Sequence, residues 1–231
     1  GVALGKAYQA TGKEEYARRA VLILDYIAQV YPHYPAIVQS VRLFRFAKSQ
    51  DPPFPSSATG KWGWTIKSEM TYAALVPQCY DLVYDSEEFD KLSRERGYDV
   101  REKLENDFFR AIFVFAHSSP AIRTHKDNTA PGRLGTAAMI GRVINEPRYV
   151  HWAFYWAKEM VNSNCFYDGM WHESASYHYY ALAHLRRDVF TRLKGYSDPT
   201  GYIDEVDGTH LDNLDPEVEV PFLAKAMHAP E

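Results

Sequence analysis

Two polar segments in the C-terminal half of this 231-residue chain carry the side chains best suited to chemistry. Residues 125–133 read HKDNTAPGR, and residues 168–180 read DGMWHESASYHYY. In the first segment Asn128 and Thr129 lie just before Pro131, a residue favoured in the first turn of a helix. Asn128 can therefore be an ordinary helix cap. Alternatively, its amide and the free N–H groups of that helix end can bind an anion such as a substrate carboxylate.

The second segment combines a turn with a titratable helix start. Asp168-Gly169 signals the turn, and a helix is expected from Ser174 onward. Residues four apart share a helix face, so Glu173 should lie near Tyr177 and Ser174 near His178. This is either a solvated helix end above packed aromatic rings or a site for proton transfer.

Helices must position both segments. Apolar residues at helical spacing predict a hairpin of helices over 1–10 and 14–30, turned at Thr11-Gly12-Lys13. Further helices are expected over 36–48, 66–84 with a kink at Pro77, 99–117, 131–144, 147–163 and 173–194. Residues 51–57 and 196–220 read as irregular, and few stretches alternate as strands do. The fold class expected is all-α, built from antiparallel helical hairpins in a toroid or a solenoid.

The string DGMWHESASYHYYAL, residues 168–182, resembles the Ser–Tyr–His region of heparinase II/III-like polysaccharide lyases. The resemblance implies that Tyr177 is the catalytic acid, in some members also the base. It also makes Asn128 the counterpart of an asparagine that binds the uronate carboxylate. Several members have a histidine directly after that asparagine, where this chain has Thr129, so His125 or His172 is the candidate replacement.

The hairpin sequences TGKEEYA (11–17) and YDLVYD (80–85) also resemble the toroid helices of this family, so the resemblance covers most of residues 1–195. It implies an incomplete (α/α) toroid over 1–195 that is truncated at its N-terminus. Residues 196–231 would then be an irregular connection toward a C-terminal β-sandwich, which supplies another histidine in the family. Gly1 to Leu4 already read as mid-helix, so we expect a longer protein.

The implied reaction is β-elimination in uronic-acid-containing glycans, by a secreted or periplasmic enzyme. A free tyrosine phenol has a pKa of about 10, so acting as a base requires a stabilised anion. Arg123, Arg133 and His178 are candidates for that role by their proximity in sequence. Trp62-Gly63-Trp64 either stacks on sugar rings or packs in the interior. The predicted substrate-binding residues are Arg133, Arg123, Glu173, Trp62, Trp64 and Trp171.

The composition of the chain limits the classes of partner that it can bind. A net charge of −4 and a pI near 6.2 argue against a general nucleic-acid binder, and no apolar run approaches the length of a membrane span. Cys79 and Cys165 show no metal-ligand spacing and could be buried thiols or one disulfide. His172 and His178 do not share a helix face, so we expect no metal or other cofactor in this segment, while a further domain could hold a structural metal. The oligomeric state stays open.

Two other functions fit the same residues. A glycoside hydrolase on an α/α toroid would need two carboxylates across the scissile bond, for which Asp127 and Glu173 could be proposed. A non-catalytic glycan-binding module would keep the aromatic residues, which make up 15% of the chain, and would need neither Asn128 nor Tyr177.

Overall fold

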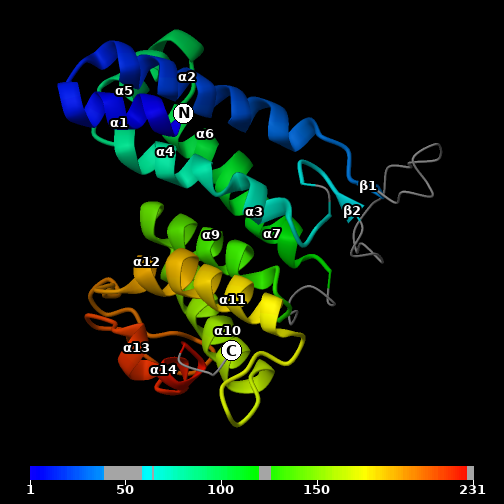
Figure 1. Ribbon diagram of the computed structural model, residues 1–231. Coiled ribbons are helices and arrows are strands. Elements are labelled where there is room, and N and C mark those ends of the chain that lie inside the picture. Colours follow the sequence, from blue (N-terminus) through cyan, green and yellow to red (C-terminus); the bar gives the residue numbers. More distant parts are fainter. Residues whose placement is uncertain (39–58, 64, 120–125, 228–231) are drawn as a thin grey trace. The chain divides into compact units, whose positions relative to one another are not determined.

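The computed structural model describes residues 1–38, 59–63, 65–119 and 126–227 (Figure 1). Helices dominate these residues, which confirms the expected all-α class. The chain divides into two compact units, Gly1–Arg123 (unit 1) and Thr124–Glu231 (unit 2). The division suggested by the sequence, a toroid domain over 1–195 and a connection over 196–231, stays a prediction. Within the described ranges, no helix is both long enough and apolar enough to cross a membrane.

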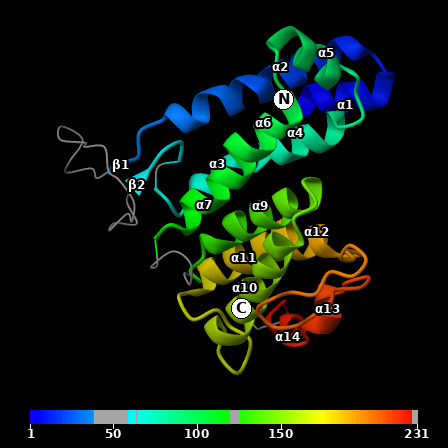
Figure 2. The same ribbon diagram turned by 180° about the vertical axis from the view of Figure 1, so that it is seen from behind.

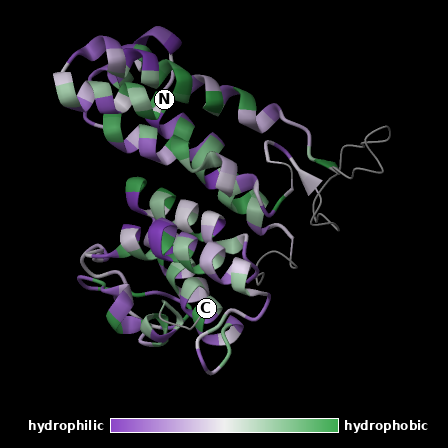
Figure 3. Ribbon diagram, in the orientation of Figure 1, coloured by the Kyte–Doolittle hydropathy of each residue, from purple (hydrophilic) through white to green (hydrophobic). Residues whose placement is uncertain are grey.

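Unit 1 opens with the predicted hairpin of α1 (Val2–Thr11) and α2 (Glu14–Val30). Gly12 ends α1 in the left-handed conformation, φ 66°, and its N–H donates to the carbonyl oxygen of Tyr8. Both hydrophilic and hydrophobic residues occur along the length of α2 in Figure 3. The core face of α2 consists of the positions expected from the sequence spacing, which are Ala17, Ala20, Val21, Leu24 and Ala28.

The helix expected over 66–84 is divided into α3 (Glu69–Ala73) and α4 (Leu75–Val83). The interruption falls at Ala74, upstream of Pro77 rather than at it. Proline has no N–H for the carbonyl four residues earlier, here that of Ala73, and its ring crowds that carbonyl, so the helix breaks in the preceding turn.

Two elements of unit 1 differ from expectation. Helix α5 (Glu88–Arg96) was not predicted, because its charged sequence offers only Phe89 and Leu92 as buried apolar side chains. The helix expected over 36–48 is wrong at its start, since Ile37–Val38 form strand β1, paired antiparallel with β2 (Thr59–Gly60). The partner strand is distant in sequence, so local periodicity could not reveal it. Residues 39–58 lie outside the described residues.

The remaining helices of unit 1 agree with the prediction for 99–117. A short 3₁₀ turn, η1 (Tyr31–His33), follows α2 at Pro32. Helix α6 (Val100–Leu104) continues through a π-helical turn, η2 (Glu105–Arg110), into α7 (Ala111–His117). The Asp99 side chain caps α6 by accepting a hydrogen bond from the N–H of Glu102 at 3.0 Å.

Unit 2 contains α9 (Ala130–Val143) and α10 (Pro147–Asn164), which lie side by side in both views (Figures 1 and 2). Helix α11 (Ala175–His184) runs through the π-helical turn η3 (Leu185–Phe190) into α12 (Thr191–Leu193), as the prediction for 173–194 requires. Residues 196–214 are irregular as expected, but the irregular segment predicted to reach residue 220 is interrupted by a helix at 216–219. Two short helices follow that were not predicted, α13 (Pro216–Glu219) and α14 (Phe222–Met227), and α14 packs against α10.

Candidate functional site

The loop before α9 places Asn128 one residue ahead of the helix cap. Thr129 occupies the N-cap position, and its N–H and hydroxyl both donate to Asp127 Oδ1, at 3.0 and 2.6 Å. The N–H of Ala130 donates to the carbonyl of Asp127 at 3.0 Å. These bonds hold the turn without using the Asn128 amide. Asn128 is half-buried.

A tight loop leads from α10 to α11. The N–H of Phe166 donates to the carbonyl of Met170 at 2.7 Å, and Gly169 between them has φ 96°, which favours glycine. Ser174 then caps α11 by accepting a hydrogen bond from the N–H of Tyr177 at 3.3 Å. The predicted turn and helix start are therefore confirmed, and Tyr177 lies in the first turn of α11 with 47% of its surface exposed.

His178 and Trp171 are both buried and bonded to each other. The N–H of Trp171 donates to His178 Nδ1 at 3.0 Å, which leaves His178 with its hydrogen on Nε2 when the ring is neutral. The indole Nε1 of Trp171 donates to Glu173 Oε2 at 2.7 Å. His178, only 4% exposed, thus anchors the loop, whereas its neighbour Tyr177 faces solvent.

Asn164, at the end of α10, joins the two polar segments. Its carbonyl oxygen accepts hydrogen bonds from both the N–H and Nδ1 of His172, each at 2.9 Å. Its side-chain amide donates to the carbonyl oxygen of Lys126 in the loop before α9. Lys126 Nζ in turn donates to Ser163 Oγ at 2.7 Å. The loop before α9 and the loop before α11 are therefore tied to the same end of α10.

The packing of α9 against η3 also places the two polar loops at one end of unit 2. A Cβ placed on Gly135 would come within 2.2 Å of the carbonyl oxygen of Asp188, so the two backbones touch there. Further along both elements, the Arg142 guanidinium donates to the carbonyl oxygen of Arg192. Contacts that advance in the same direction along both elements mean that α9 and the α11–η3 helix run parallel. Asn128 and Tyr177 therefore precede or begin parallel helices at one end of unit 2.

Arg133 lies inside unit 2, with 1% of its surface exposed. Burial lowers the pKa of its guanidinium to about 10, against the opposing influence of the Asp127 carboxylate. A buried Arg133 side chain could contact a polymer in solvent only if the residues that cover it moved away. The side chains of His172 and Tyr177, by contrast, are exposed.

The tryptophan predicted as a sugar-stacking residue belongs to unit 1. Trp62 is 37% exposed, and its ring packs on Phe108 with the centroids 5.2 Å apart. Its N–H donates to the buried carboxylate of Glu69 at 2.9 Å, which also accepts the N–H of Gly63 at 2.7 Å. Trp62 is thus a fixed, partly exposed ring. The other predicted residues, His125, Arg123 and Trp64, lie outside the described residues.

Sequence reasoning missed two groups in unit 2. Asn164 is a lone asparagine at a helix end, and no motif marks it. His151, Asp204 and Asp207 present metal-ligand atoms that all lie within 4.8 Å of one another, although the histidine is far from the carboxylates in sequence. The sequence had suggested no such ligand set. Cys79 and Cys165, left open as thiols or a disulfide, are free thiols.

No protein-family model matches this chain, and no curated protein matches it.

Proposed function

We propose that this chain is the helical catalytic part of a polysaccharide lyase of the heparinase II/III-like kind, cleaving uronic-acid-containing glycans by β-elimination. The observation that supports this proposal is the gathering of the Asn128 loop, His172 and Tyr177 at one end of unit 2, where Asn164 ties both loops to α10. A carboxylate-binding amide, a phenol and an imidazole at one surface are the groups that this reaction uses.

The first task is to make the C5 proton of the uronate acidic. While the neighbouring carboxylate is charged, that proton is very weakly acidic, because removing it builds further negative charge. Asn128 would donate hydrogen bonds to the carboxylate and stabilise the enolate-like intermediate. One preorganised donor of this kind contributes about 3–4 kcal/mol.

Proton transfer completes the reaction. Tyr177, exposed on the first turn of α11, would protonate the oxygen that leaves C4. His172 is the stronger candidate for the base, because its Nδ1 hydrogen is held by the carbonyl of Asn164, which leaves the Nε2 lone pair of the neutral ring available. His178 is buried and its Nδ1 is occupied by Trp171, so its role here is to position the loop.

The finer architecture belongs to the same proposal. The helical hairpins would form part of an (α/α) toroid, completed by a C-terminal β-sandwich in a longer chain, and Trp62 would stack on a sugar ring. A large anionic polysaccharide is met outside the cytoplasm, so the enzyme would be secreted or periplasmic. The identity of the polymer depends on loops around the site.

The test measures ultraviolet absorbance of the unsaturated uronate product while the full-length protein meets a panel of uronic-acid polysaccharides. We expect one polymer to give a signal that Tyr177→Phe and Asn128→Ala lose by at least about 100-fold, the scale of one acid or one oxyanion donor. Tyr179→Phe, the same change on the same helix at a similarly exposed tyrosine, is the matched control and should keep normal turnover.

The outcomes separate the competing functions. New reducing ends without the absorbance signal would indicate a hydrolase, for which Asp127 and Glu173 are the carboxylates to change next. Glycan binding with neither product would indicate a binding module. Normal activity in Tyr177→Phe would show that another group is the acid.

A further inference from the structure

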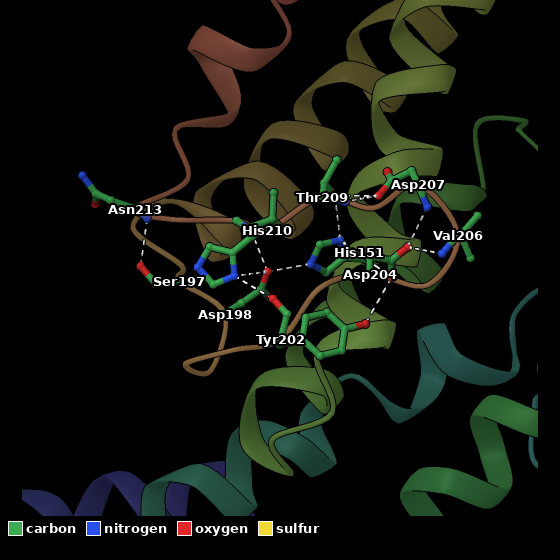
Figure 4. Close-up of polar contacts among 11 residues, drawn as sticks. His151, Ser197, Asp198, Tyr202, Asp204, Val206, Asp207, Thr209, His210 and Asn213 are labelled. Atoms are coloured by element: carbon green, nitrogen blue, oxygen red, sulfur yellow. Dashed lines mark hydrogen bonds and ion pairs between the residues drawn. The ribbon is translucent and has the colours of Figure 1, made fainter.

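A second polar cluster lies in unit 2 around His151, in the first turns of α10 (Figure 4). The irregular segment 196–214 passes over this histidine and contributes Asp198, Asp204, Asp207 and Thr209. We call these five residues the His151 cluster. His151 is 7% exposed and Asp204 5% exposed, so most of the cluster is removed from solvent.

Asp198 fixes the orientation of the imidazole. Its Oδ2 lies 2.8 Å from His151 Nε2 and also accepts the N–H of Leu211 at 2.6 Å. Because a carboxylate accepts and does not donate, Nε2 carries the hydrogen in this pair. The other ring nitrogen, Nδ1, then points to the loop, where Asp204 Oδ2 lies 3.8 Å away and Thr209 Oγ1 3.3 Å away.

Neither Thr209 nor Asp204 donates a hydrogen bond to an unprotonated Nδ1. The single hydroxyl hydrogen of Thr209 is used by Asp207 Oδ1, at the much shorter distance of 2.6 Å. An ionised Asp204 has no hydrogen to give. The buried Nδ1 therefore faces only accepting oxygen atoms, an arrangement satisfied either by a second hydrogen on the ring or by a metal ion between Nδ1 and the carboxylates.

We propose that the His151 cluster binds one divalent transition-metal ion, Zn²⁺ or Mn²⁺, through His151 Nδ1 and the carboxylates of Asp204 and Asp207. Zn²⁺ lies about 2 Å from its N and O ligands, so two donors of one ion are roughly 3–4 Å apart. The distance of 3.8 Å between Nδ1 and Asp204 Oδ2 falls in that range, and the ligand atoms of all three residues lie within 4.8 Å of one another.

The donor set selects the class of ion. An imidazole nitrogen with two carboxylates suits Zn²⁺ or Mn²⁺ better than Ca²⁺ or Mg²⁺, which prefer oxygen alone. Asp198 on the far side of the ring provides the outer carboxylate that metal-bound histidines commonly use to fix their tautomer.

The ion would join the loop to the helix. Residues 196–214 have no regular secondary structure, and His151 is the cluster's one residue on α10. His151 and Asn164 lie at opposite ends of that helix, roughly 20 Å apart at about 1.5 Å per residue. The metal is therefore a structural clamp, independent of the proposed lyase chemistry.

The test removes metal from the full chain with a chelator and adds back Zn²⁺, Mn²⁺ or Ca²⁺. Titration calorimetry should show one bound equivalent of Zn²⁺ or Mn²⁺, with Ca²⁺ much weaker. At an ion concentration about 100 times Kd, Tm should rise by roughly 5–10 °C. Asp207→Asn, at an exposed ligand, should weaken binding at least about tenfold, and Asp198→Asn should weaken it by about 10- to 100-fold.

Asp212→Asn is the matched control, because Asp212 is an exposed aspartate of the same loop that accepts a hydrogen bond from Ser197 and lies outside the cluster. It should bind the ion as the unchanged protein does. Absence of binding by the folded protein, or equal binding by Asp207→Asn, would overturn the proposal. So would a nuclear magnetic resonance titration showing that Nδ1 of His151 is protonated at neutral pH with the ion present.

Discussion

Replacing Gly135 with alanine should destabilise unit 2, although helix propensity alone predicts the opposite. Gly135 lies inside α9, where alanine is normally favoured over glycine by about 0.5–1 kcal/mol. A Cβ there would stand 2.2 Å from the carbonyl oxygen of Asp188 and 2.8 Å from its carbonyl carbon. Both atoms belong to the backbone of η3, which cannot rotate aside as a flexible side chain can.

Relief of this overlap requires α9 and η3 to separate by about 1 Å, since real Cβ contacts essentially never fall below 3.0 Å. Overpacking of this kind typically costs about 1–3 kcal/mol, and a rigid backbone neighbour favours the upper end. Subtracting the propensity gain of about 1 kcal/mol leaves a net loss near 2 kcal/mol. For a chain of this length, that loss lowers Tm by roughly 4–8 °C.

Thermal unfolding of the full chain, followed by circular dichroism, measures the effect. Asn162→Ala is the control, because Asn162 is an exposed position near the end of α10 and alanine keeps only the Cβ that asparagine already has. It should leave Tm unchanged or raise it slightly. A higher Tm for Gly135→Ala would refute the close approach of α9 and η3, and with it the parallel packing that brings the two polar loops together.

Three further predictions concern unit 2. Ser174→Ala removes the cap on the N–H of Tyr177 and should cost about 1 kcal/mol in a denaturant titration; an unchanged midpoint would mean that the cap is not used. Burial opposes ionisation of Asp188, but hydrogen bonds from Arg187 and His184 hold its pKa below the ordinary value. The ionised carboxylate therefore stabilises the fold above about pH 4, and this contribution is lost as the pH falls further. Asp188→Asn should reduce the loss of stability at acid pH in a plot of unfolding free energy against pH. An unchanged loss at acid pH would contradict this. Burial raises the pKa of Cys165 to about 11, so on the order of 0.1% of this residue is thiolate at pH 8. Its reaction with a thiol reagent should therefore be slow until the protein unfolds. A reaction rate like that of a free thiol would contradict this.

Some features of the candidate site follow from local sequence signals, and others depend on tertiary packing. The turn at Gly169, the cap at Ser174 and the helix start near Pro131 were predictable, because each depends on bonds between residues a few positions apart. The roles of Asn164 and His178 were not, because their partners lie in other segments. Nor could the sequence show that Arg133 is buried, since α9 is buried on most sides and its apolar residues mark no single face.

The sequence by itself determined most of the helices, since apolar spacing, proline and glycine act within a few residues. It determined the hairpin of α1 and α2 and the long helices of unit 2. The tertiary structure decided which segments meet: the β1–β2 pair, the contact of Gly135 with η3, and the approach of His151 to Asp204. These contacts join positions far apart in the chain, and their free energy comes from burial and hydrogen bonding that exist only once the helices have packed.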